Sequence, residues 1–239
     1  MSFDPNQLDR DYGTPSGVIT EAQYTTRTFL WMMLGLMITF GVGILGWFTN
    51  ATLYILSALP ATPLVILVAT LILSLTLTTR IEKMSVASAQ LIFVVFSVLI
   101  GFTMSTWLYL YDLTSVIFVF LATAVYFGVL AAYGHFTRRN LAGIGPILLS
   151  GLLFLIVFGA LSLFIPALSG LNSLYCLFGI AVFLGYTAYD TQRIREFYYY
   201  YSGYPDMMEK ASIFSALQLY MDFINLFLYL LRFLGNKRD

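Results

Sequence analysis

Polar side chains recur along one face of the apolar segment at 211–233, near the end of the chain. Apart from Tyr220, the residues between them are apolar. Because a polar stripe facing lipid would be costly, we expect this face of the predicted helix to point into the protein. A spacing of 3, 4, 3, 4 and 3 residues places six side chains on this one helical face: Ser215, Gln218, Asp222, Asn225, Tyr229 and Arg232.

Asp222 is the residue of this stripe that most needs a partner. It lies about 11 residues into the segment, which is roughly 16 Å at the rise of an α-helix. Inserting an Asp at the centre of a membrane helix costs about 3 kcal/mol, so the side chain should face protein or water. The best candidate partner is Asp190, because a short connection can place the two final segments antiparallel.

A pair formed by Asp190 and Asp222 predicts specific chemistry. Two carboxyl groups within hydrogen-bonding distance share a proton in a low-dielectric site, and both become charged only when the pH increases. The charged pair would offer oxygen ligands to a hard cation such as calcium, as a transient metal contact. We therefore predict a pH sensor on an ion pathway. The alternative is structural: the stripe locks helices together by hydrogen bonds, and Asp190 pairs with Arg193.

Motifs for enzymatic catalysis are absent from the sequence. It contains no nucleophile elbow, no HExxH and no phosphate-binding glycine loop. The context YMDF at 220–223 does not supply the GxGD-like pattern of an intramembrane aspartyl protease. One histidine, His135, cannot form a zinc site alone, and the single Cys176 cannot form an internal disulfide. We expect a protein that is not an enzyme and needs no cofactor.

The composition shows what kind of elements position these residues. Hydrophobic residues make up 59% of the chain and charged residues 10%, with a mean hydropathy of +0.84. Soluble domains contain about 25% charged residues. The formal net charge is zero, which argues against a nucleic-acid partner. The chain is therefore predicted to be an integral membrane protein that contacts the lipid bilayer over most of its surface.

Seven apolar segments are long enough to cross a bilayer, which takes about 20 residues of α-helix. We predict an all-α membrane protein with a polar cytoplasmic tail at 1–27 and a single seven-helix transmembrane domain at 28–239. The tail lacks the basic and apolar regions of a cleavable signal peptide, so the first segment should be retained. The segments are expected at 28–48, 53–79, 86–107, 113–133, 144–165, 171–189 and 211–233.

Basic residues predict the orientation, because short cytoplasmic loops retain Lys and Arg. The first, third and fifth loops hold none. The seventh segment breaks the rule, since a full crossing leaves Arg232, Lys237 and Arg238 outside; a re-entrant segment is the alternative. The N-terminus is expected in the cytoplasm, on the side of Arg10, Arg27, Arg80, Lys83, Arg138, Arg139, Arg193, Arg195 and Lys210.

Three stretches carry a resemblance to a known family: LGYTAYDTQRI at 184–194, LYMDFINLFLYLLRFLGN at 219–236 and GHFTRRNLAGIG at 134–145. They resemble the Bax inhibitor-1 family, or transmembrane Bax inhibitor motif proteins, in its bacterial inner-membrane branch. The resemblance implies seven helices, the last central and surrounded by the other six. It also implies a di-aspartyl pH sensor at Asp190 and Asp222, and a pH-sensitive calcium leak. Arg232 matches an arginine of the family, whereas the segment at 53–79 lacks an acidic residue that some relatives carry.

The leading hypothesis is a pH-sensitive, calcium-permeable leak channel of a bacterial plasma membrane, gated by the carboxylate pair. Calcium and protons would be its ligands, and we expect a monomer. The alternative is a membrane interaction protein that regulates a membrane protease or protein quality control, with other membrane proteins as partners. A proton-coupled transporter is a third reading, although no inverted repeat supports it.

Overall fold

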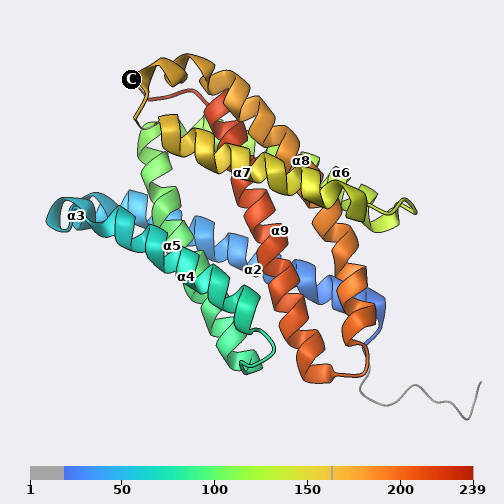
Figure 1. Cartoon of the computed structure of the whole chain (residues 1–239). Coiled ribbons are helices and arrows are strands. Elements are labelled where there is room, and N and C mark those ends of the chain that lie inside the picture. Colours follow the sequence, from blue (N-terminus) through green and yellow to red (C-terminus); the bar gives the residue numbers. More distant parts are fainter. Residues whose placement is uncertain (1–18, 163, 239) are drawn as a thin grey trace, which may run out of the picture.

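The computed structural model describes residues 19–162 and 164–238. Within these residues the regular elements are helices, arranged as an elongated bundle (Figure 1). Short 3₁₀ turns at Ala142–Ile144 and Pro166–Leu171 directly precede α7 and α8, respectively. The α-helices are α2 (Glu21–Phe48), α3 (Ala51–Ala58), α4 (Thr62–Arg80), α5 (Val86–Leu110), α6 (Leu113–Phe136), α7 (Gly145–Ser162), α8 (Asn172–Tyr201) and α9 (Pro205–Leu234).

Seven of these helices are long and apolar enough to cross a membrane; the short α3 is not among them. The prediction of an all-α protein with seven membrane-spanning helices is therefore confirmed. The first helix begins at Glu21, before the apolar segment, because Thr20 and Gln23 form a capping box at its start. The predicted tail at 1–27 falls largely outside the described residues, which begin at 19.

The second predicted segment, 53–79, is not one continuous helix. The chain forms α3, turns at Leu59, Pro60 and Ala61, and then forms α4. Proline disfavours helical backbone at the residue before it, and Leu59 is indeed non-helical with φ −133° and ψ 81°. A second proline, Pro63, stands in the first turn of α4, where its missing N–H costs nothing. The crossing is therefore made by α4 alone.

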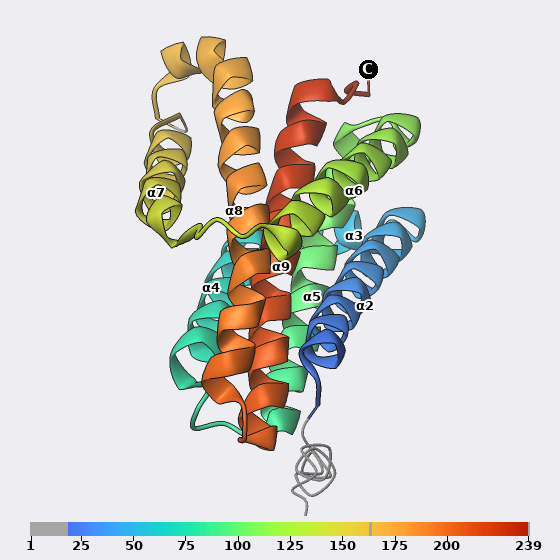
Figure 2. The same ribbon diagram turned by 90° about the vertical axis from the view of Figure 1, so that its right-hand side faces the viewer.

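Helix α9 is the most buried of the seven spans and α4 the least. It packs against α2, α5, α6 and α8, and it stands among them in both views (Figures 1 and 2). The main contacts of α4 are with α5, and those of α7 are with α8. The expected ring of all six helices around the last one is therefore not confirmed; four of the six pack extensively on it.

Helix α9 traverses the whole bundle. Near its start, the Lys210 ammonium donates to the carbonyls of Glu82 and Met84, between α4 and α5. Beyond its end, the Asp112 amide, between α5 and α6, donates to the carbonyl of Asn236 over 3.0 Å. These two contacts lie at opposite ends of α5. The arrangement fits a full crossing and does not fit the re-entrant alternative.

Two glycines allow helices to approach closely. A Cβ atom on Gly134 of α6 would collide with the backbone carbonyl of Ala188 on α8. A Cβ atom on Gly35 of α2 would lie 2.7 Å from the Phe93 ring on α5. The hydrophobic effect does not bring helices together within lipid, so close van der Waals packing at small residues stabilises their contact instead. The α6 contact also fixes α8, which carries Asp190.

Candidate functional site

The hairpin of α8 and α9 brings Asp190 and Asp222 together. The two helices pack along each other and are joined by a short turn in which Gly203 takes a left-handed φ of +96°. Asp190 is 7% exposed and Asp222 is 4% exposed. Their carboxyl groups interact electrostatically and are within hydrogen-bonding reach of each other. The two residues that the sequence paired are therefore neighbours.

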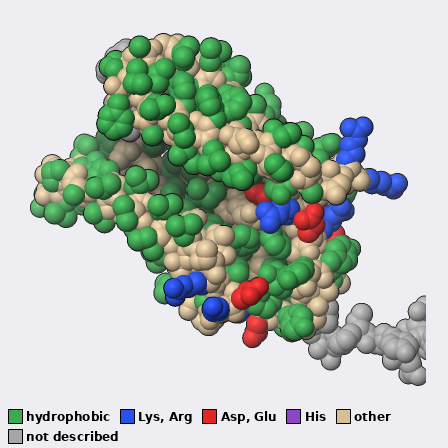
Figure 3. Space-filling model, in the orientation of Figure 1, with side chains coloured by type: hydrophobic (Ala, Val, Ile, Leu, Met, Phe, Trp, Pro, Cys, Tyr) green, Lys and Arg blue, Asp and Glu red, His purple; other side chains and the backbone are tan. Residues whose placement is uncertain are grey.

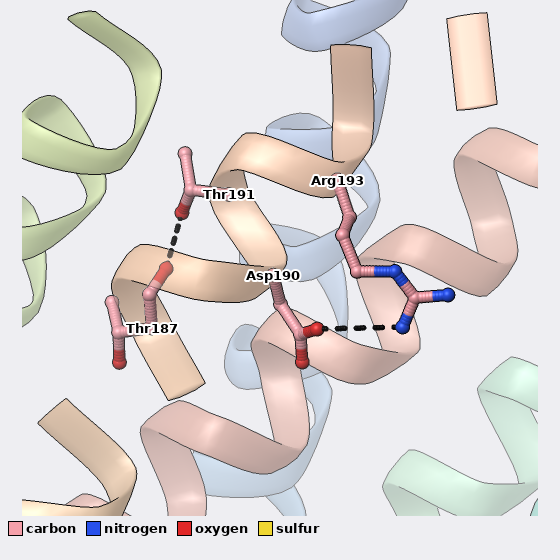
Figure 4. Close-up of polar contacts among 4 residues, drawn as sticks. All are labelled: Thr187, Asp190, Thr191 and Arg193. Atoms are coloured by element: carbon pink, nitrogen blue, oxygen red, sulfur yellow. Dashed lines mark hydrogen bonds and ion pairs between the residues drawn. The ribbon is translucent and has the colours of Figure 1, made fainter. Parts of the chain in front are cut away.

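The surroundings of the pair leave two carboxyl oxygens without a hydrogen bond. Neither Asp190 Oδ1 nor Asp222 Oδ2 has a hydrogen-bond partner, although both atoms are buried. The nearby Thr187 hydroxyl donates to the Phe183 carbonyl of its own helix over 2.8 Å. The Thr191 hydroxyl donates to the Thr187 carbonyl over 2.6 Å (Figure 4). Unpaired buried oxygens are costly, so this site is suited to a proton, a water molecule or a cation.

In the part of the chain that the structure describes, one basic side chain forms an ion pair with this site. Arg193 Nη1 lies 3.8 Å from Asp190 Oδ1, one helical turn away (Figure 4). The same guanidinium lies over the rings of Tyr189 and Phe197, at 5.6 and 5.0 Å from their centroids. Among the described residues Asp222 has no ion pair of its own. Two carboxyl groups with one guanidinium carry a net charge of about −1 when both are ionised.

A cavity of about 580 Å³ adjoins the pair. Four helices line it: α4, α7, α8 and α9. Along α9 the lining extends from Phe214 to Tyr229, about 22 Å at the helical rise. Figure 3 shows the surface hollowed between α4 and α7. The cavity thus follows the central helix through much of the depth of the bundle.

Most of the predicted stripe lines this cavity. Gln218, Asp222, Asn225 and Tyr229 all contribute to its wall. The Asn225 amide donates to the Met221 carbonyl over 2.8 Å. The Tyr229 hydroxyl donates to that of Tyr175 over 3.1 Å. The face that the spacing predicted as inward therefore does face the interior.

The two ends of the stripe lie elsewhere. Ser215 is buried beside the Tyr24 hydroxyl, near the start of α2. Arg232 donates from Nη2 to Asn172 Oδ1 over 2.7 Å, and its guanidinium lies 5.4 Å from the centre of the Tyr175 ring. Asn172 is the partner that the sequence did not reveal. The stripe therefore combines cavity-lining residues with two residues that tie α9 to its neighbours.

Several lining residues were missed by the sequence analysis. Ser74 and Thr78 of α4 face the cavity, as does Tyr186 of α8. Ser74 and Thr78 are four residues apart in an apolar segment, and Tyr186 is four residues before Asp190, so helical spacing could have identified them. The walls from α7, which include Leu152 and Ile156, carry no such signal because that helix is apolar all round.

The site does not hold the full ligand set of a calcium-binding protein. Calcium takes 6–8 oxygen ligands. The described residues contain no group of three or more His, Cys, Asp or Glu side chains able to share a metal ion. Two carboxyl groups and nearby amide oxygens suit a passing cation that keeps part of its water shell.

The chain is similar to one protein family and to several bacterial proteins over most of its length. The family model described as "Inhibitor of apoptosis-promoting Bax1" matches residues 21–239. A protein of Rickettsia prowazekii is 36% identical over 217 residues, 91% of each chain. The inner membrane protein YbhL of Escherichia coli is 32% identical over 216 residues, 90% of this chain and 92% of YbhL. A protein of Deinococcus radiodurans is 35% identical over 217 residues, 90% of this chain and 91% of its own.

Proposed function

Because the chain belongs to the Bax inhibitor family of membrane proteins, as its last two helices suggested, we propose that it is a pH-regulated, calcium-permeable leak channel. Its proposed location is a bacterial inner membrane, with the N-terminus in the cytoplasm and a single chain as the working unit. The observation that carries the proposal is the buried pair of Asp190 and Asp222 on the wall of a cavity that follows α9.

The proposed mechanism uses protonation of the pair. With one proton shared, the carboxyl groups hold α8 and α9 together, and the pathway is closed. When the pH increases and the proton leaves, the two carboxylates repel each other and face the cavity with a net negative charge. A calcium ion is attracted, but Arg193 offsets part of the charge. Weak binding of this kind lets an ion leave again, as conduction requires.

Calcium flux into proteoliposomes tests the proposal directly. The wild type is compared with Asp190→Asn and Asp222→Asn from mildly acidic to mildly alkaline pH. We expect a leak that increases with pH in the wild type and loses its pH dependence in both variants. Asp206→Asn, the same change at an exposed site on α9, is the matched control. A wild-type flux no greater than that of empty liposomes would contradict the proposal and favour the interaction protein.

A further inference from the structure

We propose that the cavity beside Asp222 is also a binding site for lipophilic amines, which enter it sideways from the bilayer. The ammonium group would lie at Asp222, and the apolar body would lie along the walls from α7, α8 and α9. This inference goes beyond the channel, because it requires cation binding at the pair and lateral access but no conduction.

The charges at the pair suit one positive charge. Arg193 lies beside Asp190, whereas Asp222 has no ion pair among the described residues. Asp222 Oδ2 is buried and lacks a hydrogen-bond partner, and the residue lines the cavity. An ammonium group carries one charge and donates up to three hydrogen bonds, and bonds between charged groups are about twice as strong as neutral ones. A monovalent amine would therefore neutralise the pair together with Arg193.

The remaining walls suit an apolar and aromatic body. Ring faces attract cations, and buried apolar surface contributes about 25 cal/mol per Å². The cavity volume of about 580 Å³ is typical of sites for small organic ligands. The apolar and aromatic lining residues include Leu152, Ile156, Phe183, Tyr186, Phe214 and Met221.

The cavity opens toward lipid. Helix α9 runs up the page in Figure 1, and Figure 3, drawn in the same orientation, shows the hollow between α4 and α7. It therefore faces to the side of the bundle rather than to either end. Both helices expose apolar side chains, such as Leu71 on α4 and Ile156 on α7. A molecule that dissolves in the bilayer can reach this opening, and a fully hydrated ion cannot use the same route.

Two fluorescent probes that differ only in the amino group test the inference. 2-(2-Naphthyl)ethylamine carries the ammonium group and 2-ethylnaphthalene lacks it. Each is titrated at neutral pH against the full-length protein in lipid nanodiscs, with empty nanodiscs as the blank. We expect saturable binding of the amine only. Asp222→Asn should weaken it about tenfold or more, Asp222→Glu should restore it, and Asp206→Asn should leave it unchanged.

A second pair of variants keeps the test independent of the carboxyl groups. Ile156→Trp places a large side chain at the exposed edge of the cavity, whereas Ile147→Trp makes the same change on α7 away from it. We expect only Ile156→Trp to weaken amine binding. Equal binding of the two probes, or undiminished amine binding by both Asp222→Asn and Ile156→Trp, would overturn the inference. Amine binding is measured without calcium flux. A failure of this inference can therefore be distinguished from a failure of the channel proposal.

Discussion

Asp190 and Asp222 form a pair, yet their surroundings differ. Asp190 Oδ1 lies 3.8 Å from Arg193 Nη1. Asp222 has no ion pair among the described residues, and its buried Oδ2 has no hydrogen-bond partner. Helical spacing along the segment that forms α9 predicted Asp222, and the short connection to the preceding segment, together with the family resemblance, predicted Asp190 as its partner. The sequence did not show that Ser215 and Arg232 turn to other partners, because those contacts depend on Tyr24 and Asn172 in distant segments.

Residues that share one proton should not act independently. We expect the double variant Asp190→Asn/Asp222→Asn to lose the pH dependence of calcium flux no more than either single variant does. Calcium flux is measured against pH for the wild type, the two single variants and the double variant. Additive losses, with the double variant much worse than each single one, would show that the two carboxyl groups work separately.

Gly134 provides a prediction about close packing. Gly134→Ala should lower the free energy of unfolding by about 1–3 kcal/mol, because the added methyl group meets the backbone of Ala188 and backbone yields poorly. Gly128→Ala on the same helix is the control, since nothing lies within 4 Å of a Cβ atom there. It should be neutral or slightly stabilising. Thermal unfolding in detergent distinguishes the two, and equal behaviour would contradict the close contact of α6 and α8.

At the scale of elements, α4 is held differently from the other spans. It packs mainly on α5 and buries only Leu77 fully. Its C-terminal end is connected to α9 by Lys210, whose ammonium donates to the carbonyls of Glu82 and Met84. The break before α4 was visible at Pro60, but average hydropathy does not distinguish one long apolar helix from two. The buried state of Lys210 could not be predicted, because its partners are backbone atoms of a loop more than 100 residues away.

Lys210 should therefore control the order of the turn after α4. We expect Lys210→Met, which keeps the length but removes the donors, to increase amide hydrogen exchange in residues 78–88 several-fold. Lys83→Met changes an exposed lysine in that same turn and is the control. Unchanged exchange in Lys210→Met would mean that the turn is ordered by other contacts.

At the scale of the whole molecule, the number and type of the spans followed from composition and hydropathy. The cavity did not, because α4, α7, α8 and α9 all contribute to its wall, and the sequences of separate helices do not specify the gap between them. The C-terminal basic residues conflicted with the charge rule. In the structure the backbone of Lys237 forms a β-bridge with Tyr111, and the backbone amide of Arg238 donates to the Leu110 carbonyl, at the end of the bundle opposite Lys210.

Cysteine labelling tests this arrangement of the ends. We expect Asn236→Cys to react with a membrane-impermeant maleimide in intact cells, and Ser202→Cys to react only after permeabilisation. The native Cys176 is fully buried and provides a low background. Labelling of both engineered cysteines under the same condition would contradict a full crossing by α9.

The position of α9 also bears on biosynthesis. The most buried helix, α9, follows α2 to α8 in the chain, so those helices are made before the element that covers their inner faces. Until α9 is inserted, α2, α5, α6 and α8 lack the helix on which they pack, and the Asp190 side chain lacks Asp222. The residues after α9 then form hydrogen bonds with the connection between α5 and α6, which they can do only once α9 has been made. A nascent chain that stops before 205 would expose a polar, unfilled centre to lipid, and a quality-control protease could distinguish it from the finished protein.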